Sequence, residues 1–343
     1  MNEPAEHREL QDILAILGDA DAGLRGRQPK TWLDRLAAQH EQLDRVLRWC
    51  QTENQSDLGL EISGVVWPYW LHRGRLSEGT IWLEALLATT SAARPSIGRA
   101  RSLAGAGTIA FFRGDLVASA ELLHKSLTIA EHLHFAQGIA EAHSGLSRIA
   151  MAKSAPDQIR QHSQTALSAA RATADEQGIA IALHHIAHAS LIDGNLLEAE
   201  RLYSENIEIF RGMERYELLA SELHNLGHVA CLRGNANRAQ LMFRESLNLG
   251  QEVGSTALLP YNIIGFGRVA VALGNFEHGA VLLGAGTAML RREGKALLQL
   301  LRPGIENAIA QARVVLGTTR FEAAMQRGSA LSSDELFAMI ANP

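Results

Sequence analysis

Apolar and polar positions along the chain follow the spacing of amphipathic helices, in blocks separated by short polar turns. Two neighbouring examples are LVASAELLHKSLTIAEHL (Leu116–Leu133) and GIAEAHSGLSRIAMA (Gly138–Ala152). Ala, Leu and Gly are abundant in these blocks, and aromatic residues make up only 5% of the chain, which favours closely packed helices over sheets. The pattern therefore predicts an all-α protein.

The turns between these blocks recur at a fixed interval of 40 residues. Glycine marks the turns at 74, 114, 194, 234 and 274, and Ser154 stands where the series lacks a glycine. Glycine tolerates the left-handed backbone of a sharp turn, and the Asp or Asn that often follows it can cap the next helix. We therefore expect about six helix-turn-helix repeats of 40 residues, each with a helix A before the turn and a helix B after it.

A column of small residues accompanies the turns, seven positions before each of them. Its members are Trp67, Gly107, Ser147, Ala187, Gly227 and Gly267. A small side chain here lets helix A approach helix B closely. Because one helical hairpin cannot bury its apolar face alone, we expect the repeats to stack into a right-handed superhelical solenoid with a concave and a convex side.

The repeats divide the chain into three predicted regions. Residues 1–54 are expected to form an N-terminal helical cap, residues 55–290 the repeats, and residues 291–343 a C-terminal helical cap. The first repeat concentrates aromatic residues, namely Trp67, Tyr69, Trp70 and Trp82. They either seal one end of the solenoid, as terminal repeats require, or form a docking patch for a partner.

The repeat pattern resembles the tetratricopeptide repeat (TPR), as in GTIAFFRGDLVAS and GHVACLRGNANRA. More narrowly, the chain is similar to the C-terminal sensor region of LuxR/MalT-like and AfsR-like bacterial transcriptional regulators. This similarity rests on WLDRLAAQHEQLDRVLRWC (Trp32–Cys50), WPYWLHRGRLSEGTIWLEALL (Trp67–Leu87), the repeats and LLGAGTAMLRREG (Leu282–Gly294). It implies a segment that receives an inducing signal. The sequence contains no GxxxxGK[ST] phosphate loop and no evident basic helix-turn-helix segment, so neither nucleotide switching nor DNA binding is carried over to it.

Composition narrows the choice of partners. The net charge is −5 at pH 7, which argues against direct nucleic-acid binding, and no run of 18 apolar residues predicts a membrane span. The N-terminal decapeptide is acidic and lacks the apolar core of a signal peptide. Only two cysteines occur, Cys50 and Cys231, which suits a reducing, cytoplasmic compartment. No nucleophile elbow or metal–carboxylate pattern is found, so we expect neither an enzyme nor a cofactor.

The exposed face of helix A is expected to line the concave groove. Three polar columns of this face share one property, in that they gather Arg, His and Tyr side chains in the later repeats. The candidate groove residues are Arg148, His184, His188, His224, His228, Tyr261 and Arg268. Next to them runs an apolar column that includes Phe111, Met151 and Cys231. An apolar wall beside a few convergent polar groups is typical of a small-ligand or peptide site.

The paired histidines allow three interpretations. They contact a small anionic inducer or a peptide carboxylate, flanked by the two arginines; or they bind Zn²⁺; or they are structural residues carried along by repeat duplication. The metal alternative uses His184, His188, His224 and His228. Four imidazoles would then bind Zn²⁺ at about 2.0–2.1 Å, although the nearby arginines disfavour a cation.

These observations predict a non-enzymatic ligand-sensing or protein-interaction module of a bacterial transcriptional regulator, which binds an inducer or a peptide in the concave groove. The alternative is a stand-alone TPR scaffold that recruits a partner protein. No direct contact of this chain with nucleic acid or membrane is expected.

Overall fold

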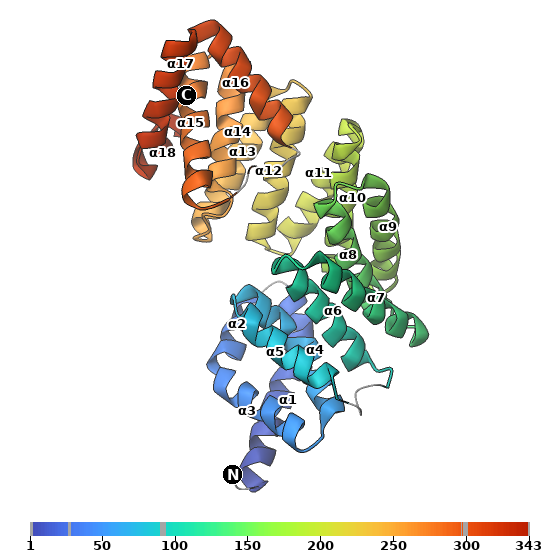
Figure 1. Cartoon of the computed structure of the whole chain (residues 1–343). Coiled ribbons are helices and arrows are strands. Elements are labelled where there is room, and N and C mark those ends of the chain that lie inside the picture. The colour runs from blue at the N-terminus through green and yellow to red at the C-terminus, as the bar shows by residue number, and fades with distance from the viewer. Residues whose placement is uncertain (1–2, 27–28, 90–93, 296, 298–300, 342–343) are drawn as a thin grey trace. The chain divides into compact units, whose positions relative to one another are not determined.

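The computed structural model describes residues 3–26, 29–89, 94–295, 297 and 301–341, which form α-helices and connecting turns without any strand (Figure 1). The other positions belong to the predicted caps and the first repeat and lie outside the described residues. The helices are α1 (Glu3–Arg25), α2 (Pro29–Ala38), α3 (His40–Thr52), α4 (Ser56–His72), α5 (Leu76–Leu87), α6 (Ile97–Phe112), α7 (Leu116–His132), α8 (Ala136–Ala152), α9 (Pro156–Ala172), α10 (Glu176–Ile192), α11 (Leu196–Gly212), α12 (Tyr216–Leu232), α13 (Ala236–Glu252), α14 (Leu259–Ala272), α15 (Phe276–Arg292), α16 (Arg302–Leu316), α17 (Thr318–Ala330) and α18 (Ser333–Ala341).

The turns between the helices use a left-handed residue at a regular interval. Each of the six predicted turn positions has a positive φ, including Ser154 at 52°. The alternate turns, from helix B to the next helix A, do the same at positions 134, 174, 214 and 254. From α7 to α13 every helix has 17 residues, so the backbone repeats every 20 residues although the sequence repeats every 40.

The turn at Gly114 shows how the sequence ends one helix and starts the next. Gly114 has φ 87°, and the Asp115 backbone N–H donates to the Ala110 carbonyl at 3.0 Å, which closes a Schellman-type helix end. The Asp115 carboxylate then accepts from the Ala118 N–H at 2.9 Å and caps α7. Asn195 and Asn235 cap α11 and α13 in the same way.

The column of small residues brings helices A and B of one repeat together. A Cβ added to Gly107 would lie 2.8 Å from Leu123 Cγ, and one added to Gly227 would lie 2.6 Å from the Phe243 ring. Larger side chains at these positions would separate α6 from α7 and α12 from α13. This close packing gives the all-α, TPR-like repeat fold that the sequence predicts.

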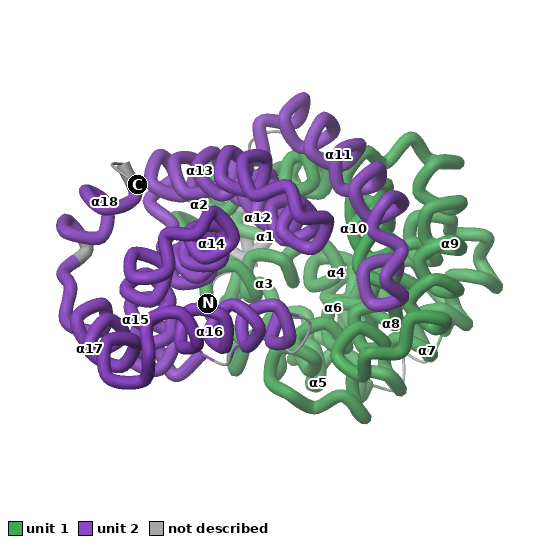
Figure 2. Tube along the Cα trace, turned by 90° about the horizontal axis from the view of Figure 1, so that it is seen from above, with its two compact units in different colours: residues 1–189 green, residues 190–343 purple. Residues whose placement is uncertain are grey.

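The chain forms two compact units, residues 1–189 (unit 1) and residues 190–343 (unit 2), which Figure 2 distinguishes by colour. In unit 1, Tyr69, Trp70 and Trp82 are buried and share one apolar core with residues of α1 to α3. The Trp82 indole N–H donates to Asp44 Oδ1 at 3.1 Å. These three aromatic side chains therefore pack inside unit 1 rather than forming a docking patch.

In unit 2, helices α16 to α18 pack against the last repeat, with α17 on α15 and α16 on α14. Gly284 of α15 and Gly328 of α17 permit a close backbone approach, because a Cβ on either would collide with the carbonyl of the facing helix. Ser332 caps α18 and exchanges hydrogen bonds with Glu335, as in a capping box. Among the described residues, no helix combines the length and apolar character needed to cross a membrane.

Candidate functional site

The predicted groove residues all lie on A helices, and the boundary between the units divides them into two groups. Each group is described within its own unit. Unit 1 contains Arg148 on α8 and His184 and His188 on α10; unit 2 contains His224 and His228 on α12 and Tyr261 and Arg268 on α14.

In unit 1, the A helices line a cavity of about 130 Å³, here called the groove cavity. Its wall includes members of the predicted polar columns from three successive repeats: Gly64, Ala104 and Ser144 from one column and Pro68, Thr108 and Arg148 from another. Trp67 covers part of the wall, packed over Gly105. The periodicity of the sequence therefore brings these positions together around one hollow.

Helix α1 supplies a charged edge of the groove cavity. Arg25 Nη2 lies 2.6 Å from Asp21 Oδ2, and Arg25 Nη1 lies 3.3 Å from Glu141 Oε1 on α8. Arg101 on α6 contacts Asp21 Oδ2 at 2.9 Å and also donates to the Gln137 side chain at 3.1 Å. This network ties the end of α1 to α6 and α8.

Two buried oxygen atoms beside the groove cavity have no hydrogen-bond partner among the described residues, namely Glu141 Oε2 and Gln177 Oε1. Burial raises the pKa of Glu141 to about 7, although Arg25 and Arg101 act in the opposite direction. Buried acceptors are normally satisfied, because an unmet one costs about 1–3 kcal/mol. Both oxygens are therefore suited to accept hydrogen bonds from a ligand.

Arg148 provides a positive group on the same wall. Its guanidinium carbon lies 5.9 and 5.8 Å from the ring centroids of Phe111 and Phe112, within the range of cation–π contacts. Burial lowers the pKa of Arg148, and no carboxylate among the described residues acts on it. Arginine stays protonated in proteins, so this guanidinium can pair with an anionic group of a ligand.

The histidines of α10 are half-buried, and they are not among the residues that line the groove cavity. Burial, and to a smaller extent His184, lower the pKa of His188 to about 4. His184 lies beside His185, with ring centroids 5.7 Å apart. His188 is therefore neutral at pH 7 and adds no positive charge.

In unit 2, the predicted residues form a buried chain of hydrogen bonds with one direction. Arg268 Nη1 lies 2.7 Å from His228 Nδ1, and because arginine can only donate, His228 Nδ1 must accept. His228 then carries its proton on Nε2 and donates to His224 Nε2 at 3.0 Å. His224 in turn donates from Nδ1 to Asn262 Oδ1 at 2.7 Å.

The chain continues through two residues that the sequence analysis did not identify. Asn262 Nδ2 donates to Ser246 Oγ at 3.0 Å, and Ser246 donates to the Ala220 carbonyl at 2.7 Å. Asn262 and Ser246 are each 1% exposed. The signal for Asn262 was present, since an amide in the apolar run YNIIGFG requires a buried partner.

The buried environment keeps both imidazoles of the chain neutral. Burial is the main reason that the pKa of His224 falls to about 4; Asn262 opposes the shift and Arg268 adds to it. Burial, His224 and Arg268 lower the pKa of His228 still further. Every ring nitrogen of this pair is engaged in a hydrogen bond, which leaves none for a metal ion. Among the described residues, no group of three or more His, Cys, Asp or Glu side chains is arranged to hold a metal.

Tyr261 lies next to this chain on α14. Its ring centroid is 6.1 Å from that of His224, and burial is the main cause that raises the pKa of its phenol. The side chain is half-buried, so it contacts the chain without belonging to it.

Comparisons with known proteins identify the fold. No protein-family model matches the chain, and no curated protein matches its sequence. Among solved structures, a Rap protein complexed with competence and sporulation factor covers 100% of this chain and 87% of its own, with a TM-score of 0.63 and 15% identity. The apo form of RapI covers 98% and 96%, with a TM-score of 0.58 and 13% identity.

A third similar structure is NprR in complex with its cognate peptide NprX. It covers 97% of this chain and 91% of its own, with a TM-score of 0.52 and 16% identity. At such identities the similarity shows the fold alone. This chain is thus a TPR-like α-helical repeat protein.

Proposed function

We propose that the chain is a non-enzymatic interaction module that binds a peptide segment in the groove cavity of unit 1. The observation that carries this proposal is the mixture of unmet groups on an otherwise largely apolar wall. Arg148 offers donors, whereas Glu141 Oε2 and Gln177 Oε1 are acceptors without a partner among the described residues. A peptide supplies both carbonyl acceptors and N–H donors, together with a side chain for the apolar part.

The size of the cavity favours part of a peptide over an enclosed ligand. Its volume of about 130 Å³ is below the ~300–1,000 Å³ of pockets that enclose a drug-sized molecule. An anchoring side chain or chain terminus fits this space, with the rest of the segment outside it. An acidic side chain or a terminal carboxylate would pair with Arg148.

Two of the similar structures support a peptide ligand. NprR is complexed with its cognate peptide NprX, and the Rap protein with competence and sporulation factor. We extend this kind of recognition to the present chain. The motifs shared with LuxR/MalT-like and AfsR-like regulators further suggest that binding serves a bacterial transcriptional regulator.

The test is a selection of short random peptides on the full chain, followed by titration of the selected peptides. Trp67 lines the groove cavity, so binding should change tryptophan fluorescence. Replacement Arg148→Met keeps the length of the side chain and removes its charge. We expect it to weaken binding at least about tenfold, equivalent to ~1.4 kcal/mol.

The matched control is Arg171→Met, the same replacement at an exposed arginine of α9. It should leave the affinity unchanged. Equal affinities for Arg148→Met and Arg171→Met would place the peptide elsewhere. If the selection yields no peptide that binds, the interaction function itself is refuted.

A further inference from the structure

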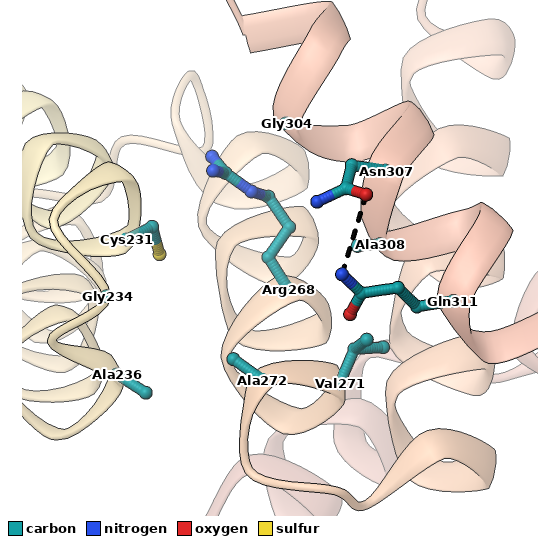
Figure 3. Close-up of a pocket in the computed structure, with 10 residues that line it drawn as sticks. All are labelled: Cys231, Gly234, Ala236, Arg268, Val271, Ala272, Gly304, Asn307, Ala308 and Gln311. Carbon is teal, nitrogen blue, oxygen red and sulfur yellow. Dashed lines mark hydrogen bonds between the residues drawn. The ribbon is translucent and has the colours of Figure 1, made fainter.

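A second cavity lies entirely within unit 2, between α12, α14 and α16. It has a volume of about 210 Å³ and is here called the Arg268 cavity. Figure 3 shows the Arg268 side chain extending from α14 toward Gly304, with Asn307 and Gln311 projecting from α16 into the same space. Cys231 faces it from α12, and alanine and valine side chains complete the wall.

Arg268 has more donors than the described residues satisfy. It is 8% exposed, and its Nη1 donates to the neutral His228. Of the described titratable groups, only Cys231 raises its pKa, against a larger lowering by burial. Residues 296 and 298–300, which lie outside the described residues, are Ala, Leu, Gln and Leu and carry no charge.

A buried guanidinium without a counter-ion is unfavourable, because desolvation of a charge costs several kcal/mol unless an opposite charge offsets it. The hydrogen-bond chain behind Arg268 supplies no such charge. His228, His224, Asn262 and Ser246 are all neutral, and the chain ends on the Ala220 carbonyl. The counter-charge must therefore come from the other side, where the cavity lies.

The start of α16 adds a second positive element to the same place. A Cβ added to Gly304 would lie 2.5 Å from Arg268 Nη2, so the guanidinium sits against the first turn of this helix. No side chain among the described residues caps α16, and its first turn has no acidic residue. Free N–H groups and the helix dipole make such a terminus attractive to an anion.

We propose that the Arg268 cavity is a binding site for the oxyanion group of a small ligand, a carboxylate or a phosphate. The guanidinium and the first-turn amides of α16 hold the charge, and the Asn307 and Gln311 amides bind the remaining polar atoms. The apolar wall contacts the carbon skeleton. This site is separate from the groove cavity, and it does not depend on the peptide function proposed for unit 1.

The experiment is calorimetric titration of the dialysed full chain with inorganic phosphate and, separately, with succinate. We expect saturable binding of one anion per chain for at least one probe. Binding of phosphate alone indicates a phosphorylated ligand, of succinate alone a carboxylate, and of both a general oxyanion site. The absence of saturable binding for both probes overturns the proposal.

Two variants locate the binding. Arg268→Lys removes the planar fork of donors and should weaken binding about tenfold, whereas the same replacement at the exposed Arg291 should not. Gly304→Ala places a methyl group against the guanidinium and should also weaken binding. This second variant decides the matter if Arg268→Lys does not fold, since alanine favours a helix. Unchanged affinity in Gly304→Ala, or equal affinity in the two arginine variants, refutes the site.

Discussion

The buried histidines should make the stability of unit 2 depend on pH. In the folded chain the pKa of His224 is about 4, because burial disfavours the charged imidazole, and that of His228 is lower still. In the unfolded chain both groups take the usual value of about 6.5. The unfolded state therefore binds more protons below pH 6.5. Stability is complete above that pH and is lost as the pH falls toward 4.

The size of the effect follows from the pKa difference. Each such histidine lowers the free energy of unfolding by about 1.4 kcal/mol per pH unit in this window. Between pH 6.5 and 5.0 one histidine thus costs about 2 kcal/mol. Histidines of unit 1 with lowered pKa values, His143 and His188 among them, act in the same direction. A variant is needed to isolate the contribution of unit 2.

The variant His228→Gln removes one titration and keeps the polarity of the chain. A glutamine oxygen can accept from Arg268, and its amide can donate to His224. Between pH 6.5 and 5.0 the wild type should lose about 2 kcal/mol more than this variant, as measured by urea unfolding with far-ultraviolet circular dichroism. His132→Gln, at an exposed position of α7, is the control.

Tryptophan fluorescence provides an internal reference, because all five tryptophans lie between residues 32 and 82 in unit 1. The difference between wild type and His228→Gln should appear in the dichroism signal and not in the fluorescence. If both chains lose stability in parallel as the pH falls, the imidazole of His228 is not held neutral by its burial, and the reasoning is refuted.

Three further replacements test the packing and the turns by urea unfolding. Ser154→Gly should raise the free energy of unfolding by up to about 1 kcal/mol, because Ser154 has φ 52°; Gly194→Ser should lower it by a similar amount, and the reverse order would contradict the strain argument. Gly227→Ala should cost about 1–3 kcal/mol, because its Cβ would lie 2.6 Å from Phe243, and a neutral result would mean that α12 and α13 separate freely. Ser332→Ala should cost about 1 kcal/mol through loss of the α18 cap.

The repeat architecture was predictable because its signals lie at fixed positions. Glycine at 114, 194 and 234 marks a left-handed backbone, and small residues such as Gly227 mark close helix contacts. Both signals reflect steric limits that few residues satisfy. The 20-residue repeat of the backbone was not visible, because positions such as Ala174 and Glu214 adopt the same conformation without glycine. Packing of the flanking helices overrides their weak local preference.

The candidate site was predictable in direction but not in depth. Helical periodicity indicates which face a residue occupies, so Arg148 was expected beside Thr108, and both line one cavity. Periodicity does not indicate how deeply a side chain is covered. His224 and His228 were expected to contribute a cationic strip, whereas burial makes them neutral and engages their nitrogens. The partners that complete the chain lie on α13 and α14, too far away in sequence for a local pattern to reveal.

The two arginines occupy the same column of the repeat, one in each unit, and each stands beside a cavity without a carboxylate among the described residues. Replacement of a buried charge by an apolar side chain of similar volume is often neutral or stabilising. An arginine kept at such a position therefore serves recognition better than stability. The two proposed sites must then respond independently: Arg148→Met should weaken peptide binding and leave phosphate or succinate binding intact, and Arg268→Lys should do the reverse. A variant that weakened both would show that one arginine acts through the stability of the whole chain.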